Sequence, residues 1–238
     1  MPSSILELPQ LQAIYPAPLP EKQLMLIAGG HPPEGTWLQE AAQKRTLWGI
    51  DRGIESCQQA DLKPSRLIGD GDSASKSSWN WGCSLPIPVE RYSPIKDLTD
   101  TQLALQIAAK TYPGCFVLLT GGFGGRFDHA FSTVYSFAFS GLSGCMADEQ
   151  EAIFFLQDTQ SLAFHTKKRP RAISLLPLSE TCTGVSIANV YWPLTDTTLK
   201  KDLPYAISNE LTASGQDFNV SLASGTLGIY MSWGSSQA

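Results

Sequence analysis

The chain has 238 residues, of which 42% are hydrophobic and 16% are charged, and its formal net charge is −5 at pH 7. This composition is that of a folded globular protein, long enough for one large domain or two smaller ones. The negative charge argues against a general nucleic-acid binder, because a phosphate backbone is bound by an excess of Lys and Arg.

Neither the N-terminus nor the cysteines indicate export. The first twenty residues, MPSSILELPQLQAIYPAPLP, lack the positive start and unbroken apolar core of a signal peptide. No apolar run approaches the length of a membrane span. The five cysteines show neither a CxxC pair nor zinc-ligand spacing. We therefore expect a cytoplasmic protein with reduced thiols that binds neither a membrane nor nucleic acid.

Apolar runs alternate with helical patterns in the first part of the chain. The runs Leu24–Ala28 and Leu47–Ile50 are predicted to be buried strands. Apolar residues at helical spacing predict helices at about 34–44 and 53–60. This alternation is typical of a parallel sheet covered by helices, in which ligands bind at the carboxyl ends of the strands. We predict a Rossmann-like α/β domain over residues 1–150.

Two carboxylates follow the next apolar run, in the segment Leu67–Ser73 with sequence LIGDGDS. Asp70 and Asp72 repel one another unless a cation lies between them, so a hard metal ion bound by oxygen ligands is the plainest explanation for the pair. Asp51 also directly follows a predicted strand. The alternative for this segment alone is a surface turn, since Gly, Asp and Ser are common turn residues.

The segment 95–109 carries the apolar stripe of a helix, and it follows a segment at 75–88 that has no clear period and is expected to be a loop. Thr99 and Gln102 have the spacing of a capping box at the helix start. Charged residues crowd this start, namely Lys96, Asp97 and Asp100. The acids could merely complement the positive end of the helix, worth about 0.5 kcal/mol each, but their crowding favours metal and phosphate binding.

A glycine-rich loop follows the strand predicted at 116–119, in the sequence FVLLTGGFGGRFDH. Backbone N–H groups exposed in such a loop bind anions, and Arg126 adds a planar cation that can grip phosphate oxygens. The loop has neither the P-loop spacing nor the dinucleotide GxGxxG pattern. Asp128 and His129 then open a helix, where they either contribute to function or act as a helix cap and a packing residue.

The chain changes character from about residue 151, where short strand-like runs are separated by Gly, Pro, Thr and Asn. Regularly spaced short strands suggest a β-sandwich, which we expect over residues 151–238. The predicted strands are 152–156, 161–165, 172–176, 184–189, 204–207, 218–223 and 226–232.

Five of these segments together resemble the motifs of the thiamin pyrophosphokinase family, in the same order and at comparable intervals. They correspond to the family's DGG, GDFDS, KDxTD, GGRxDH and SNEF elements and are Asp51-Arg52-Gly53, Ile68-Gly69-Asp70-Gly71-Asp72-Ser73, Lys96-Asp97-Leu98-Thr99-Asp100, Gly121-Gly122-Phe123-Gly124-Gly125-Arg126-Phe127-Asp128-His129 and Ser208-Asn209-Glu210-Leu211. Each motif is weak by itself, but five in register over nearly the whole chain are highly specific. The resemblance implies transfer of pyrophosphate from ATP to thiamin, giving thiamin diphosphate and AMP, with Mg²⁺ and in a homodimer.

The resemblance also implies roles for residues at the matching positions. The acidic catalytic set around Mg²⁺ would be Asp70, Asp72, Asp97 and Asp100. Asp100 is the candidate to accept the proton of the thiamin hydroxyl. The nucleotide would be bound by Asp51, Ser73, Lys96, Thr99, Gly122, Gly125, Arg126, Asp128 and His129. Thiamin, in a site between subunits, would be bound by Trp192, Ser208 and Asn209. Trp192 could instead be a core residue, and Ser208 and Asn209 could be turn residues.

Four residues depart from the family pattern, the mildest being Leu211 in place of the Phe of the last motif. Gly71 stands where the family usually has Phe, and Arg52 and Glu55 replace the usual Gly and Asn of the first motif. These departures leave two alternatives to the active enzyme. One is a non-catalytic homologue that binds thiamin or nucleotide, and the other is a pyrophosphokinase for another heterocyclic alcohol, such as a pterin.

Overall fold

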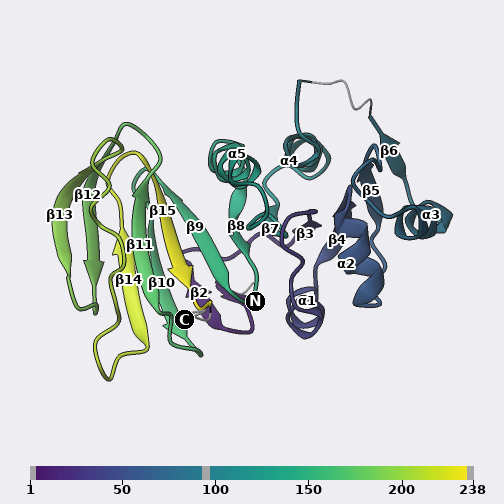
Figure 1. Cartoon of the computed structure of the whole chain (residues 1–238). Coiled ribbons are helices and arrows are strands. Elements are labelled where there is room, and N and C mark those ends of the chain that lie inside the picture. Colours follow the sequence, from purple (N-terminus) through teal and green to yellow (C-terminus); the bar gives the residue numbers. More distant parts are fainter. Residues whose placement is uncertain (1–3, 93–96, 235–238) are drawn as a thin grey trace. The chain divides into compact units, whose positions relative to one another are not determined.

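The computed structural model describes residues 4–92 and 97–234, and the chain divides into two compact units. The parallel unit is Pro20–Asp148, and the antiparallel unit combines the described residues of 1–19 and 149–238 (Figure 1). The change of unit at residue 148 lies close to the expected boundary at residue 150. The first 19 residues, which we expected in the N-terminal domain, group with the C-terminal part instead.

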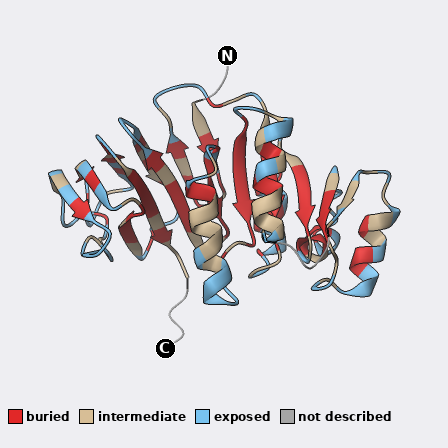
Figure 2. Ribbon diagram, turned by 90° about the horizontal axis from the view of Figure 1, so that it is seen from above, coloured by how far each residue is buried: buried red, intermediate tan, exposed pale blue. Residues whose placement is uncertain are grey.

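The parallel unit is built on strands whose neighbours all run in the same direction. In spatial order the strands are β8 (Ser143–Ala147), β7 (Phe116–Thr120), β3 (Gln23–Ile27), β4 (Thr46–Ile50), β5 (Arg66–Gly69) and β6 (Val89–Arg91). Every residue of β7 is buried, as expected for a central strand with both faces covered. Figure 2 shows these central strands in red between helices whose outer sides are exposed. Strands β3, β4 and β7 confirm the runs predicted from the sequence.

Five helices connect the strands of the parallel unit within the described residues. They are α1 (Gly35–Ala41), α2 (Gly53–Gln59), α3 (Lys76–Ser84), α4 (Asp100–Thr111) and α5 (Phe127–Ala138). The prediction of a loop at 75–88 is wrong, because α3 lies within it. The side chain of Ser75 caps this helix by accepting a hydrogen bond from the Ser78 N–H. Its buried side consists of Ser78, Trp79 and Gly82, which give no apolar periodicity.

In its described residues, the antiparallel unit contains a six-stranded sheet and three further strands. The sheet order is β1 (Ile5–Glu7), β2 (Leu11–Ile14), β10 (Ser161–Thr166), β14 (Asp217–Ser221), β12 (Thr181–Ala188) and β13 (Leu194–Lys200). The further strands are β11 (Ala172–Pro177), β15 (Thr226–Ser232) and β9 (Glu151–Gln157). The ring of Phe154 in β9 lies edge-on to that of Phe164 in β10, with centroids 5.0 Å apart. The core of this unit therefore lies between its two groups of strands.

The N-terminal strands belong to the antiparallel unit because their apolar residues are buried there. Leu6, Leu8 and Leu11 are each at most 2% exposed. Strand β2 pairs with β10, so that Ala13 lies opposite Phe164. The sequence-based assignment to the N-terminal domain was made from their position in the chain. The pairing of β2 with β10 places them in the antiparallel unit instead.

Two strand predictions for the C-terminal part differ from the structure. Residues 204–207 form no strand, and β13 (Leu194–Lys200) lies in a segment that was not predicted. Most residues of β13 are polar and exposed, so the sequence offers no apolar alternation there.

All five cysteines are free thiols, as expected. No helix in the described part of the chain is both long and apolar enough to pass through a membrane.

Candidate functional site

A cleft of about 620 Å³ opens at the carboxyl ends of strands in the parallel unit. This volume is in the range of small-molecule sites, roughly 300–1,000 Å³. The loops after β3, β4, β5 and β7 line it, together with the first turns of α4 and α5. Of the residues predicted as ligands, the cleft contains Asp51, Asp70, Asp72, Ser73, Asp97, Thr99, Asp100, Gly122, Gly125, Arg126 and His129. Lys96 lies outside the described residues.

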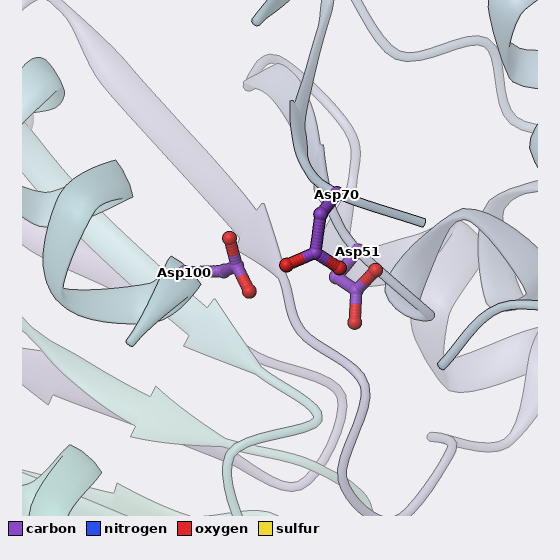
Figure 3. A group of neighbouring side chains, drawn as sticks. All are labelled: Asp51, Asp70 and Asp100. Atoms are coloured by element: carbon purple, nitrogen blue, oxygen red, sulfur yellow. The ribbon is translucent and has the colours of Figure 1, made fainter. Parts of the chain in front are cut away.

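Three carboxylates converge in this cleft. Asp51, Asp70 and Asp100 each offer an oxygen atom, and these atoms all lie within 4.8 Å of one another. Figure 3 shows Asp51 and Asp70 side by side, with the carboxylate of Asp100 facing them from the start of α4. Asp51 and Asp70 come together because they directly follow β4 and β5, which are paired in parallel so that Ile50 lies opposite Ile68.

The surroundings of Asp51 disfavour its charged form. Burial raises the pKa of Asp51, and the nearby carboxylates of Asp100 and Asp70 raise it further. The Ser73 hydroxyl and the Gly71 N–H donate hydrogen bonds to Asp51 and act in the opposite direction. A set of three carboxylate oxygens at this spacing fits a hard divalent cation such as Mg²⁺, which prefers oxygen ligands.

The residues of this group differ in part from the predicted metal ligands. Asp70 and Asp100 were predicted, whereas Asp51 was assigned to the nucleotide. Asp72 and Asp97 line the same cleft but are not part of the group of three. The Asp72 N–H donates to the Asp70 carboxylate over 3.1 Å, so Asp72 belongs to the turn that positions Asp70.

The loops after β3 and β7 approach one another closely at the cleft. The Gly30 N–H donates to the Gly121 carbonyl over 2.7 Å, and the His31 N–H donates to the Phe123 carbonyl over 2.7 Å. A Cβ atom added at Gly30 would lie 2.6 Å from the Phe123 carbonyl oxygen. Gly121 has a φ of +67°, a conformation that favours glycine. Glycine is therefore required on both sides, which leaves backbone exposed to a ligand.

Arg126 and Asp128 form a two-pronged ion pair at the end of the glycine loop. Arg126 donates to Asp128 from Nε over 3.1 Å and from Nη2 over 2.5 Å. This pairing lowers the pKa of Asp128 and raises that of Arg126. Arg126 lines the cleft, but Asp128, which was predicted to bind nucleotide, is not among the lining residues. In the structure Asp128 orients the guanidinium group and also accepts the His129 N–H.

The start of α4 is fixed by the capping box that the sequence predicted. The Gln102 N–H donates to the Thr99 hydroxyl over 3.2 Å, and the Thr99 N–H donates to the Gln102 side chain over 2.9 Å. The Gln102 amide also donates to the Ser136 hydroxyl of α5 over 3.0 Å. These bonds hold Asp100, the first residue of α4, in a defined place.

A second group of site candidates lies in the antiparallel unit. Trp192 is 55% exposed, which argues against a core role. The Asn209 amide donates to the Trp192 carbonyl over 2.7 Å and accepts the Trp192 N–H over 3.1 Å. The Ser208 N–H donates to the Ser174 hydroxyl. Asn209 thus fixes the backbone that presents the indole ring.

The cleft also contains residues that sequence reasoning did not assign to it. They are Ala28, Gly29, Gly30, Ile50, Arg52, Leu98, Thr101, Ala130 and Thr133, whereas Gly121 and Gly124 belong to the glycine loop that was expected to bind nucleotide. Gly29 and Gly30, one residue beyond the end of β3, were the available signal, because a glycine pair at the carboxyl end of a parallel strand is typical of a binding loop. The helical residues Ala130 and Thr133 carry no such signal.

Comparison with known families gives two matches along the chain. A family model described as "Thiamin pyrophosphokinase, catalytic domain" matches residues 38–142, within the parallel unit. A second, "Thiamin pyrophosphokinase, vitamin B1 binding domain", matches residues 161–227, within the antiparallel unit. A thiamine pyrophosphokinase of Bacillus subtilis (strain 168) is 27% identical over 202 residues, which cover 83% of this chain and 94% of that protein.

Solved structures resemble this fold over nearly their whole length. The thiamine pyrophosphokinase of Bacillus subtilis superposes with a TM-score of 0.76 at 23% identity, over 89% of this chain and 99% of that one. The enzyme of Geobacillus thermodenitrificans gives a TM-score of 0.74 at 24% identity, over 91% and 100%. Yeast thiamin pyrophosphokinase gives 0.67 at 14% identity, over 91% and 88%. At these identities the likeness shows a shared fold.

Proposed function

Because the chain belongs to the thiamin pyrophosphokinase family, we propose that its cleft transfers a pyrophosphoryl group from ATP to thiamin, giving thiamin diphosphate and AMP. The family and the enzyme class were predicted from five sequence motifs, and the two domain matches confirm both. One observation carries the proposal for the cleft. Three carboxylates, a glycine loop and an arginine meet in one space, which is the set that a metal-bound polyphosphate requires.

We assign the metal to the group of three. Asp51, Asp70 and Asp100 would hold Mg²⁺, and the bound ion would neutralise part of the negative charge of the phosphates. Asp72 and Asp97 line the cleft beside them. Backbone N–H groups of the glycine loop and the guanidinium of Arg126 would hold the phosphate oxygens, with Ser73, Thr99, Gly122, Gly125 and His129 around them.

The proposed reaction forms one P–O bond and breaks another. The hydroxyethyl oxygen of thiamin attacks the β-phosphorus of ATP, the bond between that phosphorus and the α–β bridging oxygen breaks, and AMP leaves. The hydroxyl proton passes to a carboxylate of the cleft, for which we retain Asp100. The reaction is accelerated by holding the thiamin hydroxyl oxygen in line with the breaking P–O bond and by neutralising the phosphate charge, because the protein forms no covalent intermediate.

Thiamin recognition is proposed for the antiparallel unit. Thiamin is a cation with two flat rings, so an exposed indole suits it chemically, and Trp192 provides one. Ser208 would contribute hydrogen bonds, whereas Asn209 uses its amide to hold the Trp192 backbone. Four features stay predictions from the sequence. They are a homodimer with thiamin between subunits, a Rossmann-like sheet, a β-sandwich and a cytoplasmic location.

The test is a product assay with purified protein, ATP, Mg²⁺ and thiamin. We expect equal amounts of AMP and thiamin diphosphate, and a loss of at least about 100-fold in turnover for Asp70→Asn, which removes a charged metal ligand. Asp61→Asn is the matched control, because Asp61 is exposed, lies outside the cleft and undergoes the same charge change.

Three results would contradict the proposal. Tight binding of thiamin or nucleotide without AMP above background would indicate a non-catalytic homologue. AMP formation with a pterin alcohol but not with thiamin would move the acceptor to another heterocycle. Normal turnover in Asp70→Asn would remove the metal assignment.

A further inference from the structure

Arg52, one of the residues that depart from the family motif, lines the cleft. It directly follows Asp51 and is the N-cap residue of α2. A Cβ atom added at Gly29 would lie 2.7 Å from the Arg52 Cβ, so the stem of Arg52 packs against the loop after β3. The side chain therefore begins between two of the loops that form the cleft.

The guanidinium group of Arg52 retains unused donors. Its Nε lies 3.8 Å from a carboxylate oxygen of Glu55, beyond hydrogen-bond distance, and 45% of the side chain is exposed. Among the described residues, Arg52 donates no side-chain hydrogen bond. Arg126 differs, because Nε and Nη2 of that residue are both engaged by Asp128. Asp128 leaves Nη1 of Arg126 for a ligand, whereas the whole fork of Arg52 is available to one.

Glu55, a second departure, fixes this arrangement. Its Oε1 accepts the Ser75 N–H over 2.6 Å, directly before α3. The other oxygen faces Arg52. Glu55 thus connects Arg52 to the segment that carries Asp70 and Ser73, so the two departures act together on one side of the cleft.

The negative charge of the cleft favours a further cation close to the bound phosphates. Five aspartates line it, namely Asp51, Asp70, Asp72, Asp97 and Asp100. One divalent ion cannot neutralise these together with a triphosphate, so a further cation in contact with the phosphates lowers the electrostatic repulsion. A planar fork is suited to that contact because it can donate two parallel hydrogen bonds to phosphate oxygens.

We propose that Arg52 binds the phosphate chain of ATP directly, as a second phosphate-binding guanidinium beside Arg126, and that Glu55 positions it. The inference rests on the proposed function, since it assumes that the cleft holds a nucleoside triphosphate. If Arg52 binds the phosphates, the affinity of this chain for nucleotide depends on a position at which the family motif has glycine.

The experiment measures binding of an ATP analogue with a methylene group in place of the α–β bridging oxygen, by titration calorimetry with Mg²⁺. We expect Arg52→Gln and Arg52→Gly to raise the Kd about 10-fold or more, the effect of losing a charge-assisted hydrogen bond. Arg52→Lys should fall between them and the parent chain, because it keeps the charge but loses the fork. Adenosine, which has no phosphate, should bind all variants equally.

Lys110→Gln is the matched control, since Lys110 is exposed on α4, lies outside the cleft and changes the net charge equally. It should leave the Kd within about 2-fold. Glu55→Gln keeps an acceptor for the Ser75 N–H but loses the charge that faces Arg52, so we expect a smaller rise in Kd than for Arg52→Gln. Melting temperatures of the variants show whether each one folds.

Two outcomes would overturn the inference. The first is an unchanged Kd of the analogue in Arg52→Gln. The second is an equal loss of adenosine and analogue binding, which would indicate a purely structural role. The parent chain separates this failure from that of the proposed function. If it forms AMP while Arg52→Gln binds the analogue normally, only the inference about Arg52 is lost; if it forms no AMP, the proposed function fails whatever Arg52 does.

Discussion

Asp51 combines a left-handed backbone, with φ of 45°, and a carboxylate surrounded by two others. Because burial and these neighbours raise its pKa above the ordinary value of 3.8, the folded chain binds a proton at Asp51 more tightly than the unfolded chain does. Stability therefore falls as pH rises from that ordinary value through the folded pKa, and it stays reduced above it.

We predict that Asp51→Asn raises the melting temperature of the metal-free protein at pH 7 by roughly 1–3 °C. The amide removes the like charge, and Asn tolerates a left-handed backbone. Melting in EDTA measures the effect, which should vanish below pH 3.8, where Asp51 is protonated in both states. Added Mg²⁺ should stabilise the parent chain and not the variant. A lower melting temperature of the variant in EDTA at pH 7 would contradict this account.

The cysteines allow a second test at this scale. Burial raises the pKa of the Cys57 and Cys145 thiols to about 12, which keeps them protonated and unreactive. Of the five free cysteines, only Cys83 is not fully buried. We expect an aromatic disulfide reagent to modify about one thiol rapidly in the native state, and all of them in denaturant. Cys83→Ser should abolish the rapid phase, and its persistence there would show that a buried thiol is accessible.

At the scale of elements, helix α3 supplies an aromatic ring that the metal loop lacks. Gly71 replaces the usual Phe of the motif, yet the Trp79 ring lies directly against it. A Cβ atom added at Gly71 would overlap that ring and would lie only 2.8 Å from its Nε1. Gly71 also has a φ of +79°. The Trp79 ring therefore occupies the space that a side chain at position 71 would need.

We predict that Gly71→Ala destabilises the protein by about 1–3 kcal/mol, because it combines backbone strain with overlap at Trp79. In a Trp79→Ala background the overlap disappears, so the same substitution should be less destabilising. Urea unfolding of the four proteins measures both effects. An equal penalty in the two backgrounds would mean that Trp79 does not limit position 71.

Elements with strong local signals were predictable, and those without them were not. The capping box of Thr99 and Gln102 predicted the helix start that the structure shows. Helix α3 and strand β13 were missed because their apolar residues follow no clear period, so tertiary contacts decide their conformation.

At the scale of the whole molecule, the motifs predicted which loops meet but not which carboxylates converge. Asp70 and Asp100 were predicted as metal ligands, whereas Asp51 joins them because β4 and β5 are neighbours in the sheet. Neighbourhood in a sheet depends on strand order, which local sequence patterns do not encode. The assignment of residues 1–19 was missed for the same reason, since it depends on pairing across about 150 residues of chain.

We predict that deletion of residues 1–19 destabilises the antiparallel unit. The deletion removes the buried side chains of Leu6, Leu8 and Leu11 and leaves one edge of β10 unpaired. Hydrogen exchange should show faster exchange in residues 161–166 of the truncated chain, with little change in β3 and β7. Uniform exchange throughout the chain would mean that the two units unfold as one.

The separation of β2 from its partner β10 along the chain also affects how the protein folds during its synthesis. The ribosome releases the N-terminal strands first, and although β1 can pair with β2, the other edge of β2 has no partner until residues 161–166 emerge. The residues between them already form a complete compact unit. We therefore expect the nascent chain to acquire its nucleotide cleft early, while its first apolar strands stay exposed and open to chaperones until translation is nearly finished.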